Sequence, residues 1–164
     1  MTAFHVAQLN IGRIRGPIDS PIMADFVALL DPINAVADAS PGFVWRLQTD
    51  EGNATAVRPY DDESIAVNMS VWESIDDLAA FVYRSGHVDV MRRRREWFER
   101  MRIYMVLWWI PAGAIPAVEE AMERLEHLEA HGPTPYAFTF KARFPSPDSG
   151  AEDMLVDDEL GCPA

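Results

Sequence analysis

The sequence predicts an α+β fold, in which one antiparallel sheet carries helices, on the strength of two periodicities. Apolar residues that alternate at period two mark four strand segments in the first 110 residues, and segments with a period near 3.6 lie between them. Their order is strand, helix, strand, strand, helix, strand, which is the split-βαβ or ferredoxin-like arrangement with both helices on one face. The chain has 164 residues, 49% of them hydrophobic, so one domain can enclose a real core.

The first half of the chain supplies two strands and a helix. Residues 4–11 alternate between two faces and form the first strand. Ser20-Pro21 is a helix-start signature, and the helix continues to about Ala39, with Pro32 expected to kink or restart it. Pro41-Gly42 then ends the helix and precedes the second strand, residues 43–49.

The second half repeats the pattern and adds two elements. Residues 64–72 form the clearest strand, and a helical region from Ser74 to Met101 is interrupted at Gly86. The fourth strand covers residues 104–110. A third helix over 116–130 and a fifth strand over 136–144 follow. The polar stretch 50–63 is expected to be a surface connection.

Composition limits the classes of function. The net charge is −12, and half of it lies in an acidic tail, so we expect a folded domain over residues 1–145 and a disordered tail over 146–164. Basic residues gather between Arg84 and Arg102 but alternate with acids, which favours a solvated helix face over nucleic-acid binding. No apolar run is long enough for a bilayer, and Cys162 is the single cysteine. We therefore expect a cytoplasmic protein without membrane or nucleic-acid partners.

A helix pair on one face leaves the other face of the sheet bare. Large aromatics are expected on that face: Trp45, Tyr104, and Trp108 or Trp109. Two-fold symmetry makes a second copy of the same sheet the simplest cover. The sequence thus predicts a homodimer, with the fifth strand extending or closing the partner's barrel.

Candidate site residues lie on the third strand and the helix after it. Asn68, Ser70 and Trp72 share one strand face and can all form hydrogen bonds, so they are expected to line a pocket wall, with surface exposure as the alternative. His87 and Arg94 share one side of the following helix and could form an acid/base and anion-binding pair, although a capping His and a solvated Arg explain them as well. His127 and His131 lack a third ligand, so no metal site is predicted.

The run from His5 through Phe144 resembles a known family. Its segments LDPINAVADASPGFVWRLQ, VNMSVWES and FVYRSGHVDVMRRRREWFERM are similar to a bacterial family of unknown function within the dimeric α/β barrel superfamily. The resemblance covers about 140 residues and leaves out only the acidic tail. It implies the same α+β fold and a barrel made by two face-to-face sheets, and it leaves the reaction open.

The wider superfamily implies two chemistries. Antibiotic-biosynthesis monooxygenases oxidise aromatic polyketides with O₂ and no metal or flavin, using an Asn and a Trp four residues apart on the third strand and an Arg from the next helix. Asn68 and Trp72 match that pair, and Arg92 or Arg94 could supply the cation. The haem-handling branch instead uses a helix His as the axial iron ligand, for which His87 is the candidate.

Three functions are therefore carried forward. The leading one is a cofactor-independent, monooxygenase-type oxidation of an aromatic or polyketide-like substrate; the alternatives are a haem protein and a non-catalytic dimer that binds a small ligand. Asn68, Trp72, His87 and Arg94 are the predicted catalytic residues. The predicted substrate-binding residues are Asn10, Trp45, Ser70 and Trp108, and Gln8 could add a further polar group. Convergence of at least three of the four predicted catalytic side chains on an apolar cavity of roughly 300 Å³ or more would favour a ligand site.

Overall fold

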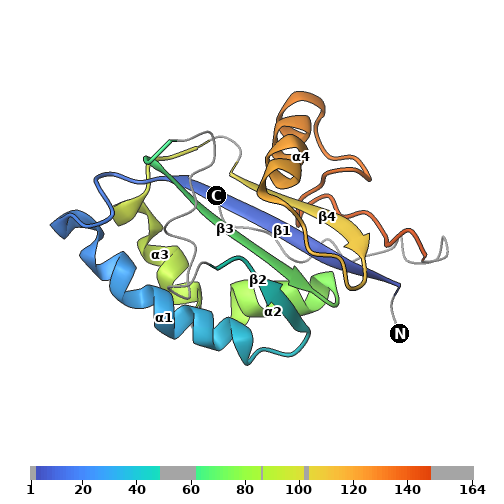
Figure 1. The fold of residues 1–164 in the computed structure, drawn as a ribbon, viewed down its shortest axis with the longest axis horizontal. Coiled ribbons are helices and arrows are strands. Elements are labelled where there is room, and N and C mark those ends of the chain that lie inside the picture. Colours follow the sequence, from blue (N-terminus) through green and yellow to red (C-terminus); the bar gives the residue numbers. More distant parts are fainter. Residues whose placement is uncertain (1–2, 49–61, 86, 102–103, 149–164) are drawn as a thin grey trace.

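A computed structural model describes residues 3–48, 62–85, 87–101 and 104–148 (Figure 1). The elements, in chain order, are β1 (Phe4–Arg13), a 3₁₀ turn η1 (Pro21–Met23), α1 (Ala24–Asp38), β2 (Phe43–Arg46), β3 (Ile65–Trp72), α2 (Ile75–Arg84), α3 (His87–Trp97), β4 (Met105–Pro111) and α4 (Val118–His131). The order through β4 is the one predicted from the sequence. The boundaries differ by a few residues, as helix and strand ends commonly do.

The sheet is antiparallel, with the strands in the order β2-β3-β1-β4. β1 and β3 are central and pair along most of their length, with Gln8 opposite Ser70 and Asn10 opposite Asn68. This order, with α1 inserted between β1 and β2 and with α2 and α3 inserted between β3 and β4, is the ferredoxin-like arrangement. The predicted α+β fold class is confirmed.

Local signals explain how the helices begin and end. Ser74 is the N-cap of α2, and its hydroxyl accepts a hydrogen bond from the backbone N–H of Asp77 at 3.1 Å. Pro32 lies inside α1, which continues through it rather than restarting at Asp31. After α1 the chain turns at Gly42, whose φ of +78° is the left-handed conformation that glycine adopts without strain.

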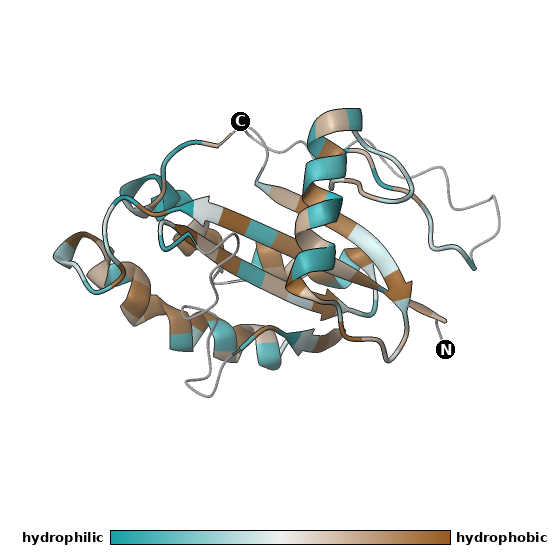
Figure 2. Cartoon of the chain, turned by 45° about the horizontal axis from the view of Figure 1, so that its top comes forward, coloured by the Kyte–Doolittle hydropathy of each residue, from teal (hydrophilic) through white to brown (hydrophobic). Residues whose placement is uncertain are grey.

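Helices cover both faces of the sheet. Helices α1, α2 and α3 lie on one side and α4 lies across the other, as Figures 1 and 2 show from two directions. The strands in Figure 2 are banded because successive side chains point to opposite faces. Ala121, Met122, Leu125 and Leu128 of α4 pack with the α4-facing residues of the sheet in one hydrophobic core.

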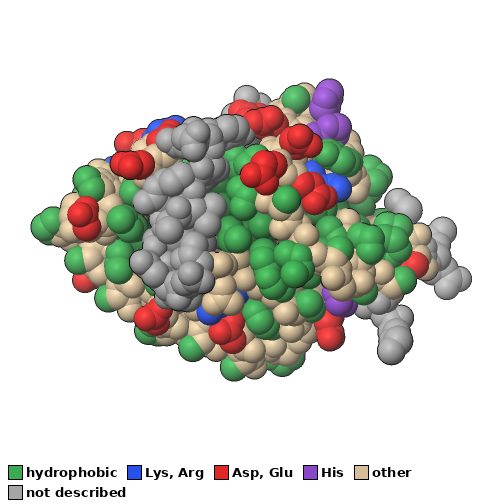
Figure 3. All heavy atoms as spheres, in the orientation of Figure 1, with side chains coloured by type: hydrophobic (Ala, Val, Ile, Leu, Met, Phe, Trp, Pro, Cys, Tyr) green, Lys and Arg blue, Asp and Glu red, His purple; other side chains and the backbone are tan. Residues whose placement is uncertain are grey.

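The predicted bare face is therefore wrong, because α4 covers it within one chain. Trp108 is fully buried in the core beneath α4, and Trp45 packs against the edge of that core. The outer surface of α4 carries exposed glutamates, and acidic side chains gather over this helix in Figure 3. The homodimer stays a prediction, but an uncovered sheet face no longer supports it.

The predicted fifth strand over 136–144 is also wrong. Phe138 exchanges two backbone hydrogen bonds with Leu107 of β4, at 2.8 and 2.9 Å, and this isolated bridge does not continue into a ladder. One residue further on, the Thr139 hydroxyl accepts from the N–H of Ala142 at 3.2 Å and the chain turns. Alternating aromatics imitate a strand here, while a side-chain hydrogen bond directs the backbone away from the sheet edge.

Other expectations fall wholly or partly outside the described residues. These are most of the connection over 50–63 and all but the first three residues of the acidic tail. Within the described part, Asp148 accepts a hydrogen bond from the N–H of Ala3 at 3.1 Å, so the start of that tail lies beside the N-terminal end of β1. Among the residues that the structure describes, no helix has the length and apolar character needed to cross a bilayer.

Candidate functional site

The two central strands bring their polar side chains to one face of the sheet. Gln8 and Asn10 alternate with buried apolar residues along β1, and Asn68, Ser70 and Trp72 do the same along β3. Since Gln8 pairs with Ser70 and Asn10 with Asn68, the two sets share the face that α1, α2 and α3 cover. A row of hydrogen-bonding groups therefore lies between the sheet and these helices.

A cavity of about 200 Å³ lies between this face and the three helices. Its wall is mostly apolar, and polar side chains of β1 and β3 are among the residues that line it. The principal apolar lining residues are Phe26, Leu29, Leu30 and Ile33 of α1, Phe81 and Val82 of α2, Met91 and Trp97 of α3, and Phe98 and Tyr104. An apolar enclosure with a few convergent polar groups is the usual construction of a small-ligand site.

The polar groups on the sheet side form one connected network, which we call the polar row: Gln8, Asn68, Ser70 and Trp72. The amide nitrogen of Gln8 donates to Asn68 Oδ1 at 2.7 Å and to Ser70 Oγ at 2.9 Å. The indole N–H of Trp72 donates to the same Ser70 hydroxyl at 2.8 Å. Gln8 and Ser70 are buried, whereas Asn68 is exposed and so lies where the cavity opens.

Aromatic packing fixes Trp72 at the inner end of the row. The indole is fully buried, stacks on Phe81 at 5.2 Å between ring centroids, and meets Phe43 edge-on at 5.5 Å. With its N–H already donated to Ser70, Trp72 offers the cavity a ring face and no free donor. Its effect on a ligand oxygen must therefore pass through the Ser70 hydroxyl.

Two of the arginines that the structure describes line the cavity, and Arg46 is paired with Asp38 at 2.7 Å, which leaves Arg94 as the candidate cation for a ligand. Four consecutive arginines begin the second half of α3, and two of them form ion pairs away from the cavity: Arg92 with Asp89 at 3.6 Å, and Arg93 with Asp25 at 2.7 Å and Glu96 at 2.9 Å. Arg94 instead lines the cavity with its guanidinium 4.1 Å from the ring centre of Tyr104. Among the described residues it has no carboxylate partner, so its charge is left for a ligand.

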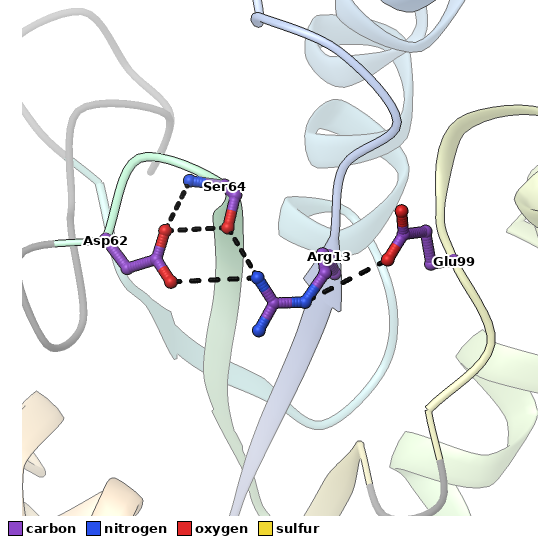
Figure 4. Close-up of polar contacts among 4 residues, drawn as sticks. All are labelled: Arg13, Asp62, Ser64 and Glu99. Carbon is purple, nitrogen blue, oxygen red and sulfur yellow. Dashed lines mark hydrogen bonds and ion pairs between the residues drawn. The ribbon is translucent and has the colours of Figure 1, made fainter.

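A second polar cluster closes the other end of the central strands (Figure 4). Arg13 at the end of β1 donates to the Ser64 hydroxyl at 2.7 Å and approaches Asp62 at 3.7 Å and Glu99 at 4.0 Å. Hydrogen bonds from the Ser64 side chain and backbone, with the nearby Arg13 charge, lower the pKa of Asp62. The cluster joins β1, β3 and the segment after α3 just outside the cavity.

Comparison with known proteins gives a family for the chain. Residues 5–154 match the family described as "Domain of unknown function (DUF3291)". The chain belongs to this family. The resemblance to an uncharacterised family that the sequence predicts is thereby confirmed. No functionally curated protein matches the chain.

Solved structures similar to this DUF3291 chain have low sequence identity. SnoaB, a cofactor-independent oxygenase from Streptomyces nogalater, is 19% identical with a TM-score of 0.46 and covers 72% of this chain and 100% of its own. NE2512, a protein of unknown function from Nitrosomonas europaea, is 13% identical with a TM-score of 0.43 and covers 70% of this chain and 97% of its own. These are likenesses only, and the family assignment rests on the sequence match.

The structure brings together most of the predicted site residues of this DUF3291 chain. Asn68, Trp72 and Arg94 line the cavity, as do Ser70 and Asn10. The cavity volume of about 200 Å³ is smaller than the roughly 300 Å³ that is expected of a ligand site. The backbone of His87 begins α3, but its side chain lies outside the described residues, so its predicted role is left as a prediction.

Two predicted substrate-binding aromatics lie elsewhere. Trp108 points to the opposite face of the sheet, beneath α4, and Trp45 packs against that same core. Neither lines the cavity. Conversely, Gln8 is predicted from the sequence only as a further polar group, although its amide hydrogen-bonds to two members of the polar row. No sequence pattern indicates the α1 residues that close the cavity. Strand alternation could have placed Gln8 on the same face as Asn10, but the choice of helix residues depends on tertiary packing.

Among the lining residues that the structure describes there is neither His nor Cys, and Met91 and Met105 supply the sulfur atoms. Across the part of the chain that the structure describes, no three His, Cys, Asp or Glu side chains gather into a group that could hold a metal ion. The haem alternative depends on His87 alone and stays a prediction.

Proposed function

We propose that this protein is a cofactor-independent, monooxygenase-type enzyme that oxidises a small aromatic phenol with O₂. The observation that carries the proposal is the combination of the polar row with the guanidinium of Arg94, which has no carboxylate partner among the described residues, on a mostly apolar cavity. A phenolate needs hydrogen-bond donors at its oxygen and an apolar environment around its ring. The cavity offers both.

The cavity size favours a substrate of one or two rings. An apolar protein cavity of about 150 Å³ binds benzene. A cavity of about 200 Å³ therefore suits a naphthol-sized molecule better than a polyketide with several fused rings. The ring would lie among Phe26, Phe81 and Trp97, with its oxygen directed toward β3.

The described residues would act by holding the phenolate. The Ser70 hydroxyl and the Asn68 amide would donate to the phenolate oxygen, and the Arg94 charge would lower the pKa of the bound phenol. The apolar helix side would exclude water from the reacting ring. Glu63 is the one carboxylate in the described lining and is exposed, so the phenol proton would leave to solvent.

The reaction balances without an added reductant, because the substrate supplies the electrons. The ring carbon opposite the phenolate oxygen forms a C–O bond with O₂, and the resulting hydroperoxide loses water to give a quinone. One oxygen atom of O₂ remains in the quinone and the other leaves in water. For 1-naphthol, the products are the 1,4-quinone and one water molecule.

Oxygen consumption with a panel of naphthols, hydroquinones and anthrones, in the presence of a chelator, tests the proposal. With ¹⁸O₂, a substrate such as 1-naphthol should give a quinone that carries one labelled atom. Asn68→Ala should lower kcat by about 100-fold, the usual cost of removing one donor from a developing oxyanion. Gln48→Ala, at an exposed position outside the cavity lining, is the matched control and should leave turnover unchanged.

Two outcomes would replace the proposal. Saturable binding of the panel without turnover, in wild type and Asn68→Ala alike, would identify a ligand-binding protein. Turnover that appears only after hemin is added, and that is lost in His87→Ala, would identify a haem enzyme.

A further inference from the structure

We infer that Gln8 sets the hydrogen-bond polarity of the cavity, so that the wall formed by β3 donates to ligand oxygens and rejects ligands that can only donate. The inference deepens the proposed function by naming what the site recognises, an aromatic molecule with an accepting oxygen. It concerns binding and not oxidation, so the two can fail separately.

The argument begins with the two hydrogens of the Gln8 amide. One is directed to Asn68 Oδ1 at 2.7 Å and the other to Ser70 Oγ at 2.9 Å. Gln8 is 6% exposed, so losing these bonds would leave buried groups without partners. An amide group can meet both neighbours as a donor only when its nitrogen faces them.

This orientation decides what Asn68 offers to a ligand. Its carbonyl oxygen is occupied by Gln8, and among the described residues its amide nitrogen has no acceptor. The free end of Asn68 is therefore the NH₂ group, which only donates. The side chain is exposed and lines the cavity, so a ligand that enters meets this donor first.

The Ser70 hydroxyl is also left to act as a donor toward a ligand, because two neighbouring groups already donate to its oxygen. Its oxygen accepts from Gln8 at 2.9 Å and from the Trp72 indole at 2.8 Å. A hydroxyl has two acceptor positions and one proton, so two incoming donors leave the proton to be directed elsewhere. An indole N–H can only donate, which fixes Ser70 as an acceptor toward Trp72 whatever else changes.

The polar groups that this wall presents to a ligand are therefore all hydrogen-bond donors. Asn68 and Ser70, two residues apart on one strand face, both present donors, and Arg94 adds a third donor group with positive charge. A carbonyl or phenolate oxygen satisfies these groups. A ligand whose only polar group is an N–H donor would bury that donor against other donors, which costs the desolvation of an unpaired polar group.

Three neutral bicyclic probes of nearly equal shape test the inference: indan-1-one accepts, indole donates, and indene does neither. Their dissociation constants can be measured by NMR titration of backbone amides under anaerobic conditions, where no oxidation occurs. Wild type should bind indan-1-one more tightly than indole, and the ratio of these two affinities in each Gln8 variant is compared with that in a reference variant that should keep the wild-type ratio. The reference is Gln48→Glu, which changes the chain's other glutamine at an exposed position in the same way.

Gln8→Glu should reverse the wall. A carboxylate accepts from Asn68 and Ser70, so the Asn68 carbonyl turns to the cavity. The indan-1-one to indole affinity ratio should then fall by about fivefold or more, the equivalent of one net hydrogen bond. Methionine has a similar length and no donor, so the affinity ratio of Gln8→Met should lie between those of wild type and Gln8→Glu. Gln8→Met replaces Gln8→Glu as the test if the buried carboxylate prevents folding.

An affinity ratio that is the same in Gln8→Glu, Gln8→Met and Gln48→Glu would overturn the inference. An indan-1-one to indole affinity ratio that is lower in wild type than in both Gln8 variants would also overturn the inference. If the ratio changes as expected but no substrate consumes oxygen, the inference stands and the proposed oxidation fails. If a substrate is oxidised but the affinity ratio does not change, the proposed oxidation stands and the inference about Gln8 fails.

Discussion

Gly12 lies where the ring of Phe98 packs directly onto the backbone of β1. A Cβ atom at position 12 would lie 2.5 Å from Cδ1 of Phe98, 2.9 Å from Cε1 and 3.1 Å from Cγ. Non-bonded carbon atoms prefer separations of about 3.5–4.0 Å, so the ring would have to move by about 1 Å. Gly12→Ala should therefore act through Phe98.

The ring has little freedom to make that movement. Phe26 meets it edge-on at 5.1 Å between centroids, and the backbone of Phe98 is bridged to Ile14. Overpacking of this kind costs about 1–3 kcal/mol. We expect Gly12→Ala to lower the free energy of unfolding by about 2 kcal/mol, which corresponds to a fall in Tm of about 4–8 °C for a domain of this size.

Urea denaturation of a double-mutant cycle measures the effect. Gly12→Ala should be nearly neutral in a Phe98→Ala background, because the obstructing ring is gone. Gly113→Ala is the control, since its Cβ would meet nothing within 4 Å and its cost comes from a φ of +90°. That cost should be the same with and without Phe98. Equal costs of Gly12→Ala in both backgrounds would refute the steric argument.

Two further predictions concern charge and assembly. Asp62 has a lowered pKa in the folded state, so its contribution to stability is present above the ordinary aspartate value of about 4 and is lost as pH falls through the folded value. Ser64→Ala should raise that pKa in a ¹³C NMR titration of Asp62, and an unchanged titration would contradict the assignment. Light scattering at micromolar concentration should give twice the chain mass of 18.4 kDa if the predicted homodimer forms, and a natively folded monomer would exclude it.

Period-two alternation placed the third-strand residues correctly because it is a local property. Whatever surrounds β3, Asn68, Ser70 and Trp72 must share a face, and the apolar residues between them must share the other. The hydrogen-bonded register with β1 is not local, since Gln8 and Ser70 are 62 residues apart. The sequence could therefore nominate Gln8 but could not show that it joins Asn68 to Ser70.

The misplaced aromatics have a different cause. Trp45 and Trp108 were assigned to an open face because the helix after the fourth strand carries no sequence signal for the side on which it packs. Once α4 covers that face, both faces of the sheet pack against helices, and alternation cannot tell a closed core from a cavity wall. The difference lies in how far helices α1 to α3 stand from the sheet, which tertiary packing decides.

The position of α4 in the chain also matters while the protein is being made. Twenty residues separate the end of β4 at Pro111 from the end of α4 at His131. At about 5–20 residues per second, a nascent chain that has completed its sheet waits roughly 1–4 seconds for the helix that covers Val106 and Trp108. During that interval a fully formed apolar sheet face has no cover of its own, which is the state in which partly synthesised chains aggregate or require a chaperone.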